Sequence, residues 1–348
     1  MIDRVTSVSV MTDENKKRIK EYYGVDVDSD LLSPMVDYIF KRLFSADDKR
    51  SKIALIDLLN SVLKLEGAGK IVDLVVINPG IPVEAEKRKK AIFDIRVKFN
   101  GGKQSIVEMQ LSGRKSFKKR AQFVISKAYS SQDISGEKYS ALKKCYLICI
   151  LNFKLLNEPA GLVTDYMFRD KDGRELTDDE TILFIQLPKV DEILNKPVET
   201  LTPEEMWGIF FRHISDKSKR EKLNAIIERK EGIKMATDVL YEISQDEEAR
   251  IQYLNELLAD LDARSWVSDA WEEGKEEGIV IGKEEGIVEG IVIGKEEGII
   301  IGKEEGIGVT LQVISALMAH TPIYEIAAKY NISIEQIERI QATLKDNS

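Results

Sequence analysis

The chain has 348 residues, a length that allows two domains or one domain with appendages. Hydrophobic residues make up 43% of the chain and charged residues 32%, which supplies a sizeable core and excludes wholesale disorder. The net charge of −9 argues weakly against nucleic acid as a partner. Because no run of about 18 apolar residues and no apolar signal core occurs, we expect neither membrane insertion nor export.

Two apolar helices are predicted before the first strand. Met35–Phe44 has apolar residues at helical spacing, and Ser33 followed by Pro34 suits a cap and a first turn. A second helix is expected over Ile53–Leu65, with the glycines that follow ending it at Gly67 and Gly69.

The pattern then changes to that of short strands rich in β-branched residues. The predicted strands are Ile71–Asn78, Ala91–Phe99, Ser105–Leu111, Cys145–Leu151 and Thr181–Leu187, with a helix over Ser116–Gln132. The order αβββαβ over residues 35–151 predicts an α/β fold, a mixed central sheet flanked by helices. The two cysteines, Cys145 and Cys149, lie in an apolar run, so we expect reduced, buried thiols and a cytoplasmic protein.

The hairpin formed by the second and third strands brings two acidic residues together. Its turn, Asn100-Gly101-Gly102, is a strong hairpin signal, and the strands on both sides alternate strictly between apolar and polar residues. A three-residue loop keeps both apolar faces aligned and places Asp94 opposite Glu108, with Cβ atoms about 5 Å apart. Gln110 lies one step further on the same face. A four-residue loop would break both faces.

Two carboxylates at that distance repel unless one takes up a proton or a cation neutralises them. Oxygen ligands with room for water suit Mg²⁺ or Mn²⁺. A metal site at Asp94 and Glu108 is therefore one interpretation. A solvent-facing acidic pair balanced by Arg96 and Lys98 would give the same pattern.

The hairpin is embedded in a basic stretch, although the chain as a whole is acidic. Twelve basic and only three acidic residues occur between Glu86 and Arg120. The residues that we expect to bind nucleic acid are Arg96, Lys98, Arg114, Lys115, Lys118, Lys119 and Arg120. A solvated strand and helix surface is the alternative.

Several segments together resemble a known family. MVDYIFKRLF, VINPGIP, KKAIFDIRV, SIVEMQL and FKKRAQFVISKAYSSQ look like the recombination-promoting nuclease and transposase family of the PD-(D/E)XK superfamily. The similarity spans residues 33–190, approximately, and is weaker beyond them. It implies Mg²⁺- or Mn²⁺-dependent cleavage of DNA, with Asp94 and Glu108 as metal ligands and the Met109 carbonyl as a third. Asp37 matches an early acidic position of the family and would help to hold metal or water.

The chain departs from the superfamily pattern at one position. Gln110 stands where many of these nucleases have a lysine, which would stabilise developing charge or orient the attacking water. Lys41 or Lys98 would have to supply that charge instead. The alternative is a catalytically degenerate nuclease fold that acts as a nucleic-acid-binding protein or an oligomeric scaffold.

The predicted organisation has five parts: an N-terminal segment 1–32, a nuclease-like domain 33–195, a helical extension 196–271, a repeat 272–308 and a tail 309–348. In the repeat a glycine falls at every fourth residue from Gly274 to Gly306. The repeat is either a spacer of marginal helicity or a surface for self-association into a homo-oligomer.

The tail contains two short helical segments. Thr321-Pro322 begins the first, and Ser333 with Gln336 forms a capping box for the second. The pattern resembles a minimal helix-turn-helix that reads DNA, or a hairpin that packs or dimerises.

Overall fold

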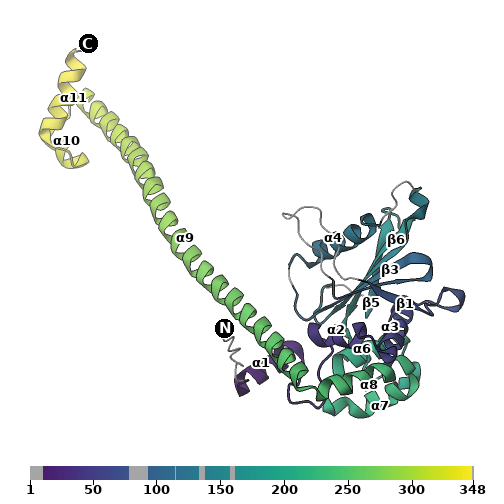
Figure 1. The fold of residues 1–348 in the computed structure, drawn as a ribbon. Helices are drawn as coiled ribbons and strands as arrows, with labels where there is room; N and C mark the ends of the chain where they lie inside the picture. The colour runs from purple at the N-terminus through teal and green to yellow at the C-terminus, as the bar shows by residue number, and fades with distance from the viewer. Residues whose placement is uncertain (1–10, 78–92, 114, 133–137, 157–160, 347–348) are drawn as a thin grey trace, which may run out of the picture. The chain divides into compact units, whose positions relative to one another are not determined.

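The computed structural model describes residues 11–77, 93–113, 115–132, 138–156 and 161–346 (Figure 1). The chain divides into two compact units, Met1–Ala263 and Arg264–Ser348, and each is described by itself. This division differs from the five predicted parts, because the first unit joins the sheet to helices on both sides of it in the sequence.

The first unit is built on one mixed sheet of six strands, which confirms the predicted α/β class. In spatial order the strands are β1 (Leu74–Ile77), β2 (Ile95–Phe99), β3 (Lys103–Gln110), β4 (Cys145–Leu151), β6 (Glu175–Gln186) and β5 (Val163–Arg169). The central strands β3, β4 and β6 are parallel, and the outer pairs are antiparallel. Strand β5 was not predicted, because its sequence VTDYMFR does not alternate cleanly and its pairing with β6 contains a bulge.

Helices cover both faces of the sheet. They are α1 (Asp13–Tyr23), α2 (Asp37–Ser45), α3 (Lys49–Val62), α4 (Phe117–Ser130), α5 (Val190–Ile193), α6 (Pro203–His213), α7 (Arg220–Arg229), α8 (Glu231–Gln245) and the first part of α9 (Glu247–Met318). Figure 1 shows α4 on one face, whereas α2, α3 and α6 lie on the other.

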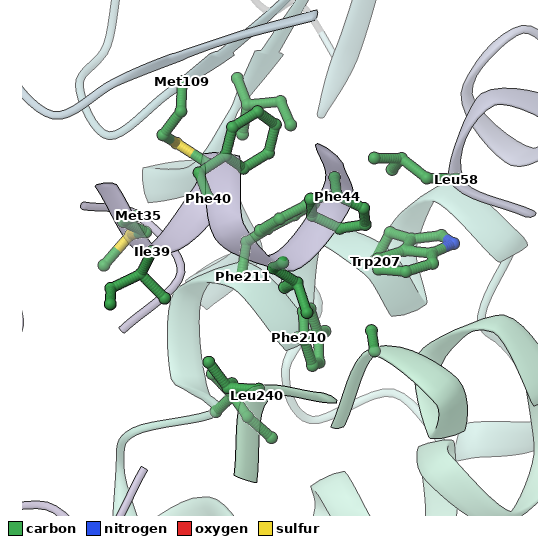
Figure 2. Packing of buried hydrophobic residues seen from close by; sticks show 14 of the residues in the cluster. Met35, Ile39, Phe40, Phe44, Leu58, Met109, Trp207, Phe210, Phe211 and Leu240 are labelled. Atoms are coloured by element: carbon green, nitrogen blue, oxygen red, sulfur yellow. The ribbon is translucent and has the colours of Figure 1, made fainter. Parts of the chain in front are cut away.

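The two faces bury separate cores. Alternate residues of β3 explain the division: Val107 and Met109 face the larger core with α2, while Ile106 faces the smaller core under α4. In the larger core, Figure 2 shows Phe40 and Phe44 of α2 gathered with aromatic residues of α6. The Phe44 ring lies 6.0 Å from the Trp207 ring.

The contact between α3 and α8 explains why the predicted helical extension belongs to the first unit. A Cβ added at Gly232 of α8 would lie 2.3 Å from the Asp57 Cβ of α3, so only glycine fits there. The Asp57 carboxylate accepts a hydrogen bond from Trp207 Nε1 at 2.8 Å and pairs with Lys230 Nζ at 2.8 Å. These contacts cross the predicted boundary at residue 195, which sequence periodicity alone does not reveal.

The hairpin has the predicted register. Phe99 pairs with Lys103 and Ile95 with Val107, so the loop has three residues. Gly101 and Gly102 both have positive φ, 75° and 99°, which glycine adopts without strain.

Two helix ends differ from their prediction. Ser33 does not cap a helix: its hydroxyl accepts from the Met35 N–H within a turn, and α2 begins at Asp37. Helix α3 ends at Val62, before Gly67, because Lys64 takes a positive φ of 52° and the Leu65 N–H bonds back to Asn60.

The second unit contains the rest of α9, α10 (Ile323–Tyr330) and α11 (Ile334–Asp346). The repeat 272–308 is α-helical and its side chains are exposed. The predicted capping box is present: the Gln336 N–H donates to Ser333 Oγ at 3.2 Å, and the Ser333 N–H donates to Gln336 Oε1 at 3.1 Å. Val313, Ile326 and Ile337 form a small core of this unit. No helix within the described ranges is long and apolar enough to cross a membrane.

Candidate functional site

Asp94 lies at a bend that immediately precedes β2. Its Oδ2 accepts a hydrogen bond of 2.8 Å from the Met109 backbone N–H, which ties this end of the hairpin to β3. The paired segment begins one residue later, at Ile95 opposite Val107, and the Glu108 carboxylate is close enough to raise the pKa of Asp94. The strict alternation predicted through Phe93 is wrong at that residue, because the bend turns Phe93 into the smaller core while Ile95 faces the larger one.

Helix α2 brings a second acidic residue and a lysine to Asp94. Lys41 Nζ lies 2.5 Å from Asp37 Oδ2 and 3.3 Å from Asp94 Oδ1. Asp37 and Lys41 are one helical turn apart, and the opposite side of the helix is anchored in the larger core by Ile39 and Leu43. The amphipathic pattern of α2 therefore positions both charged groups.

Glu108 is buried within β3, with only 2% of its surface exposed. Its Oε2 lies 3.6 Å from the guanidinium of Arg120 on α4. Cys149 is its register neighbour on β4, and the carboxylate helps to raise the pKa of that thiol, although burial is the main cause.

The acidic groups form one electrostatic cluster. Burial, together with the Asp37 carboxylate and to a lesser extent that of Glu108, raises the pKa of Asp94 to about 7 against the lowering effects of Lys41 and the Met109 N–H. Burial also raises the pKa of Glu108, against the opposing effect of Arg120, and Asp37 and Lys41 act on it as well. We call the group formed by Asp37, Lys41, Asp94 and Glu108 the acidic cluster.

The acidic cluster offers carboxylate oxygens, the type of ligand that a hard divalent cation prefers. Among the described residues, Asp37 Oδ1 and Glu108 Oε1 are buried side-chain oxygens without a hydrogen-bond partner. Buried carboxylates that raise the pKa of one another favour a cation, and an all-oxygen set suits Mg²⁺ or Mn²⁺. In the described part of the chain no three His, Cys, Asp or Glu side chains converge as a metal site, and the Lys41 ammonium lies between Asp37 and Asp94.

The predicted nucleic-acid-binding residues do not share one environment. Lys98 is exposed on β2, and Lys115, Lys118 and Lys119 are exposed at or near the start of α4. Arg120, also exposed, reaches Glu108. Arg114 lies outside the described residues.

Arg96 is the exception among the predicted surface residues. It is only 9% exposed, and its guanidinium donates to Gln104 Oε1 at 2.7 Å. Burial lowers the pKa of Arg96. A phosphate therefore has little access to Arg96. The alternation of side chains in β2 directs Arg96 to the face of the sheet that α4 covers. The alternative, in which Arg96 and Lys98 balance the acidic pair, does not describe these contacts either: Lys41 pairs with Asp94, and Arg120 pairs with Glu108.

Gln110 is half-buried at the end of β3, where its backbone carbonyl accepts from the Asn152 N–H. Lys41 is the lysine that contacts the acidic cluster, so the structure brings together Asp37, Lys41, Asp94 and Glu108 of the predicted site residues.

Sequence reasoning missed Glu256 of α9, within the first unit. Its Oε2 accepts a 3.0 Å hydrogen bond from the Tyr38 N–H in the first turn of α2. Burial raises the pKa of Glu256, and the Asp37 carboxylate adds to that effect. No local motif marks this residue, because its role depends on a helix distant in sequence.

Comparison with known proteins identifies the family. The model of the PD-(D/E)XK nuclease family transposases matches residues 34–270, more than half of the chain. No curated protein and no solved structure matches the chain. The matched range includes the acidic cluster and also α6 to α8, in agreement with their place in the first unit. The chain therefore belongs to the PD-(D/E)XK nuclease family transposases.

Proposed function

We propose that the chain is a metal-dependent DNA endonuclease that serves recombination or transposition. The observation that carries the proposal is that Asp37 raises the pKa of both Asp94 and Glu108 at one end of the hairpin, where Asp94 and Glu108 are largely buried. Membership in a family of nuclease-type transposases supports phosphodiester hydrolysis as the reaction class.

Asp94 and Glu108 would hold Mg²⁺ or Mn²⁺, with the Met109 carbonyl as a further ligand and Asp37 beside them. A bound ion supplies a water of lowered pKa and offsets charge on the phosphate. The chain itself orients the ligands: the Met109 N–H fixes Asp94 at 2.8 Å, and Arg120 fixes one oxygen of Glu108.

Lys41 would take the part that the superfamily lysine has and that Gln110 cannot fill. Burial acts to lower the pKa of Lys41, but the Asp37 and Asp94 carboxylates outweigh it and raise that pKa. Lys41 is therefore protonated at neutral pH, so it would stabilise negative charge on the phosphate rather than accept a proton.

Exposed lysines beside the cluster would hold the DNA backbone. Lys115, Lys118 and Lys119 lie at or near the start of α4, the helix that also supplies Arg120 to Glu108. Phosphate contacts of this kind give affinity that falls as salt rises, without reading sequence.

The direct test is cleavage of supercoiled plasmid by the purified full chain. We expect nicked or linear product with Mg²⁺ or Mn²⁺ and intact plasmid in EDTA, because the carboxylates alone cannot activate water. Plasmid that stays uncut with both metals would contradict the proposal.

A second candidate is a nuclease fold that binds DNA without cutting it. It is favoured by the Lys41 ammonium, which already offsets the charge of Asp37 and Asp94, and by Gln110 in place of the motif lysine. Salt-sensitive DNA binding without metal-dependent cleavage would support this candidate over the enzyme.

The repeat of α9 is the surface that we propose for self-association. Ile279, Ile287, Ile291 and Ile299 are each about half exposed or more, and a soluble monomer rarely leaves so many apolar side chains open. We expect light scattering to give a multiple of 39.4 kDa for the full chain and the monomer mass for a version lacking residues 272–308. An unchanged assembly after that deletion would remove this idea.

A further inference from the structure

A hollow separate from the acidic cluster lies between α4 and the edge of the sheet formed by β5 and β6. Its cavity volume is about 280 Å³, and its walls include the aromatic side chains of Tyr166, Phe168 and Phe184. Lys118, Ser126 and Glu180 line it as polar residues. We name this hollow the aromatic pocket.

The sheet register relates the aromatic pocket to the acidic cluster. Glu108 pairs with Cys149, and Cys149 pairs with Phe184, so one row across the sheet joins the carboxylate to a wall of the pocket. Cys149 and Phe184 both face α4. Since neighbouring strands are about 4.8 Å apart, Phe184 lies about 10 Å from Glu108.

Two of the aromatic side chains of the pocket are partly exposed to solvent. Tyr166 and Phe168 are 44% and 46% exposed on β5, the edge strand of the sheet. The Tyr166 ring packs edge-on against the Phe184 ring, with 5.7 Å between the ring centroids, and this contact orients the Tyr166 ring. Exposed aromatic faces beside cationic side chains are the usual platform for unpaired bases, because every base has a π-face.

The polar residues of the pocket complement a nucleotide. Lys118 has no ion-pair partner among the described residues, so its ammonium is available to a phosphate; Lys119 follows it on α4. Ser126 Oγ donates to Glu180 Oε2 at 2.9 Å, which orients the carboxylate and leaves its other oxygen for an amino group of a base.

We infer that the aromatic pocket binds an unpaired nucleobase of the same DNA strand whose phosphate lies at the acidic cluster. The inference rests on the proposed function and narrows its substrate class to DNA that contains, or can open to, unpaired nucleotides. Tyr166 and Phe168 stack on the base, Lys118 contacts the adjoining phosphate, and Phe184 in the pocket wall lies about 10 Å from Glu108.

The test measures binding without cleavage. Fluorescence anisotropy in EDTA would compare the full chain with Tyr166→Ala and Phe168→Ala on a labelled single-stranded oligonucleotide and on the matching blunt duplex. We expect each substitution to weaken single-strand binding about fivefold or more and to change duplex binding less. Phe123→Ala is the matched control, because Phe123 is 49% exposed on α4 but does not line the pocket.

A second probe separates stacking from a general loss of affinity. Oligonucleotides with one abasic site, moved stepwise along the strand, should bind wild type more weakly at one position, whereas Phe168→Ala should be insensitive to that loss. Equal affinities of wild type and both variants, an equal loss in Phe123→Ala, or no position dependence would overturn the inference. Unchanged DNA affinity is also the result expected if the pocket holds an apolar peptide.

These outcomes are independent of the cleavage test. Plasmid cutting that needs metal, combined with pocket variants that bind DNA normally, would retain the endonuclease and reject the base pocket. If the pocket variants lose single-strand binding but the wild-type chain does not cut plasmid, the proposed base pocket is retained and the proposed endonuclease activity is rejected. Thermal unfolding of each variant checks that lost binding does not reflect a lost fold.

Discussion

The Asp94→Asn protein is expected to nick plasmid with Mg²⁺ at least about a hundredfold more slowly than wild type, the scale seen when one group that stabilises charge in a transition state is removed. Asparagine has the same shape and can still accept the Met109 N–H, so the hairpin end keeps its position. What disappears is the negative charge that would bind the cation. The measurement is the initial rate of loss of supercoiled plasmid at saturating Mg²⁺.

Two further variants test whether the loss of activity is specific to the acidic cluster. Glu108→Gln should fail in the same way, because it removes the other buried carboxylate of the cluster. Asp246→Asn is the matched control: Asp246 also pairs with a residue of α2, Arg42 at 2.6 Å, but it is not among the groups that shift the pKa of Asp94 or Glu108. Wild-type rates in Asp94→Asn, or an equal loss in Asp246→Asn, would contradict the assignment.

The hairpin was the most predictable part of the fold. Side chains on a strand repeat with a period of two, and Asn100-Gly101-Gly102 allows few turn geometries, so local information alone predicted the register that pairs Phe99 with Lys103 and Ile95 with Val107. The bend at Asp94 was not visible, since Phe93 continues the apolar pattern and still changes face.

The partners of the carboxylates were less predictable, because they depend on packing. The direct ion pair of Lys41 with Asp94 requires α2 to lie on the larger-core face, and that of Arg120 with Glu108 requires α4 to lie on the other. Sequence neighbours suggested Arg96, which alternation instead turns inward toward Gln104. The family resemblance supplied Asp37, which spacing alone would not have selected.

The extent of the first unit could not be predicted from the sequence either, because it also depends on packing between distant segments. An amphipathic helix shows which face is apolar but not which partner covers it. The fit of Gly232 against Asp57, and the hydrogen bond from the Tyr38 N–H of α2 to Glu256, join segments that are far apart in the sequence.

The raised pKa of Asp94 has a consequence for stability that does not depend on cleavage. In the unfolded chain this group has its ordinary pKa of 3.8, whereas in the folded chain the pKa is about 7, so the folded state binds more protons between these values. The contribution of Asp94 to the free energy of unfolding is therefore largest below about pH 4 and is lost as the pH rises through about 7. The difference between the two pKa values corresponds to at most about 4 kcal/mol.

We therefore expect Asp94→Asn, without metal, to be more stable than wild type at pH 8 and close to it at pH 4. Urea unfolding in EDTA at several pH values measures the difference. Asp246→Asn should behave in the opposite way, because the hydrogen bond from Arg42 lowers the pKa of Asp246 and the charged form stabilises the fold at pH 8.

Adding Mg²⁺ at pH 8 completes the comparison. A ligand that binds only the folded state raises its stability with concentration, so wild type should recover stability while Asp94→Asn should respond much less. Parallel pH profiles for the two proteins would mean that Asp94 ionises in the fold as it does in water. The acidic cluster would then have no electrostatic need for a cation, and the metal site proposed at this end of the hairpin would lose its physical basis even if the chain cuts DNA.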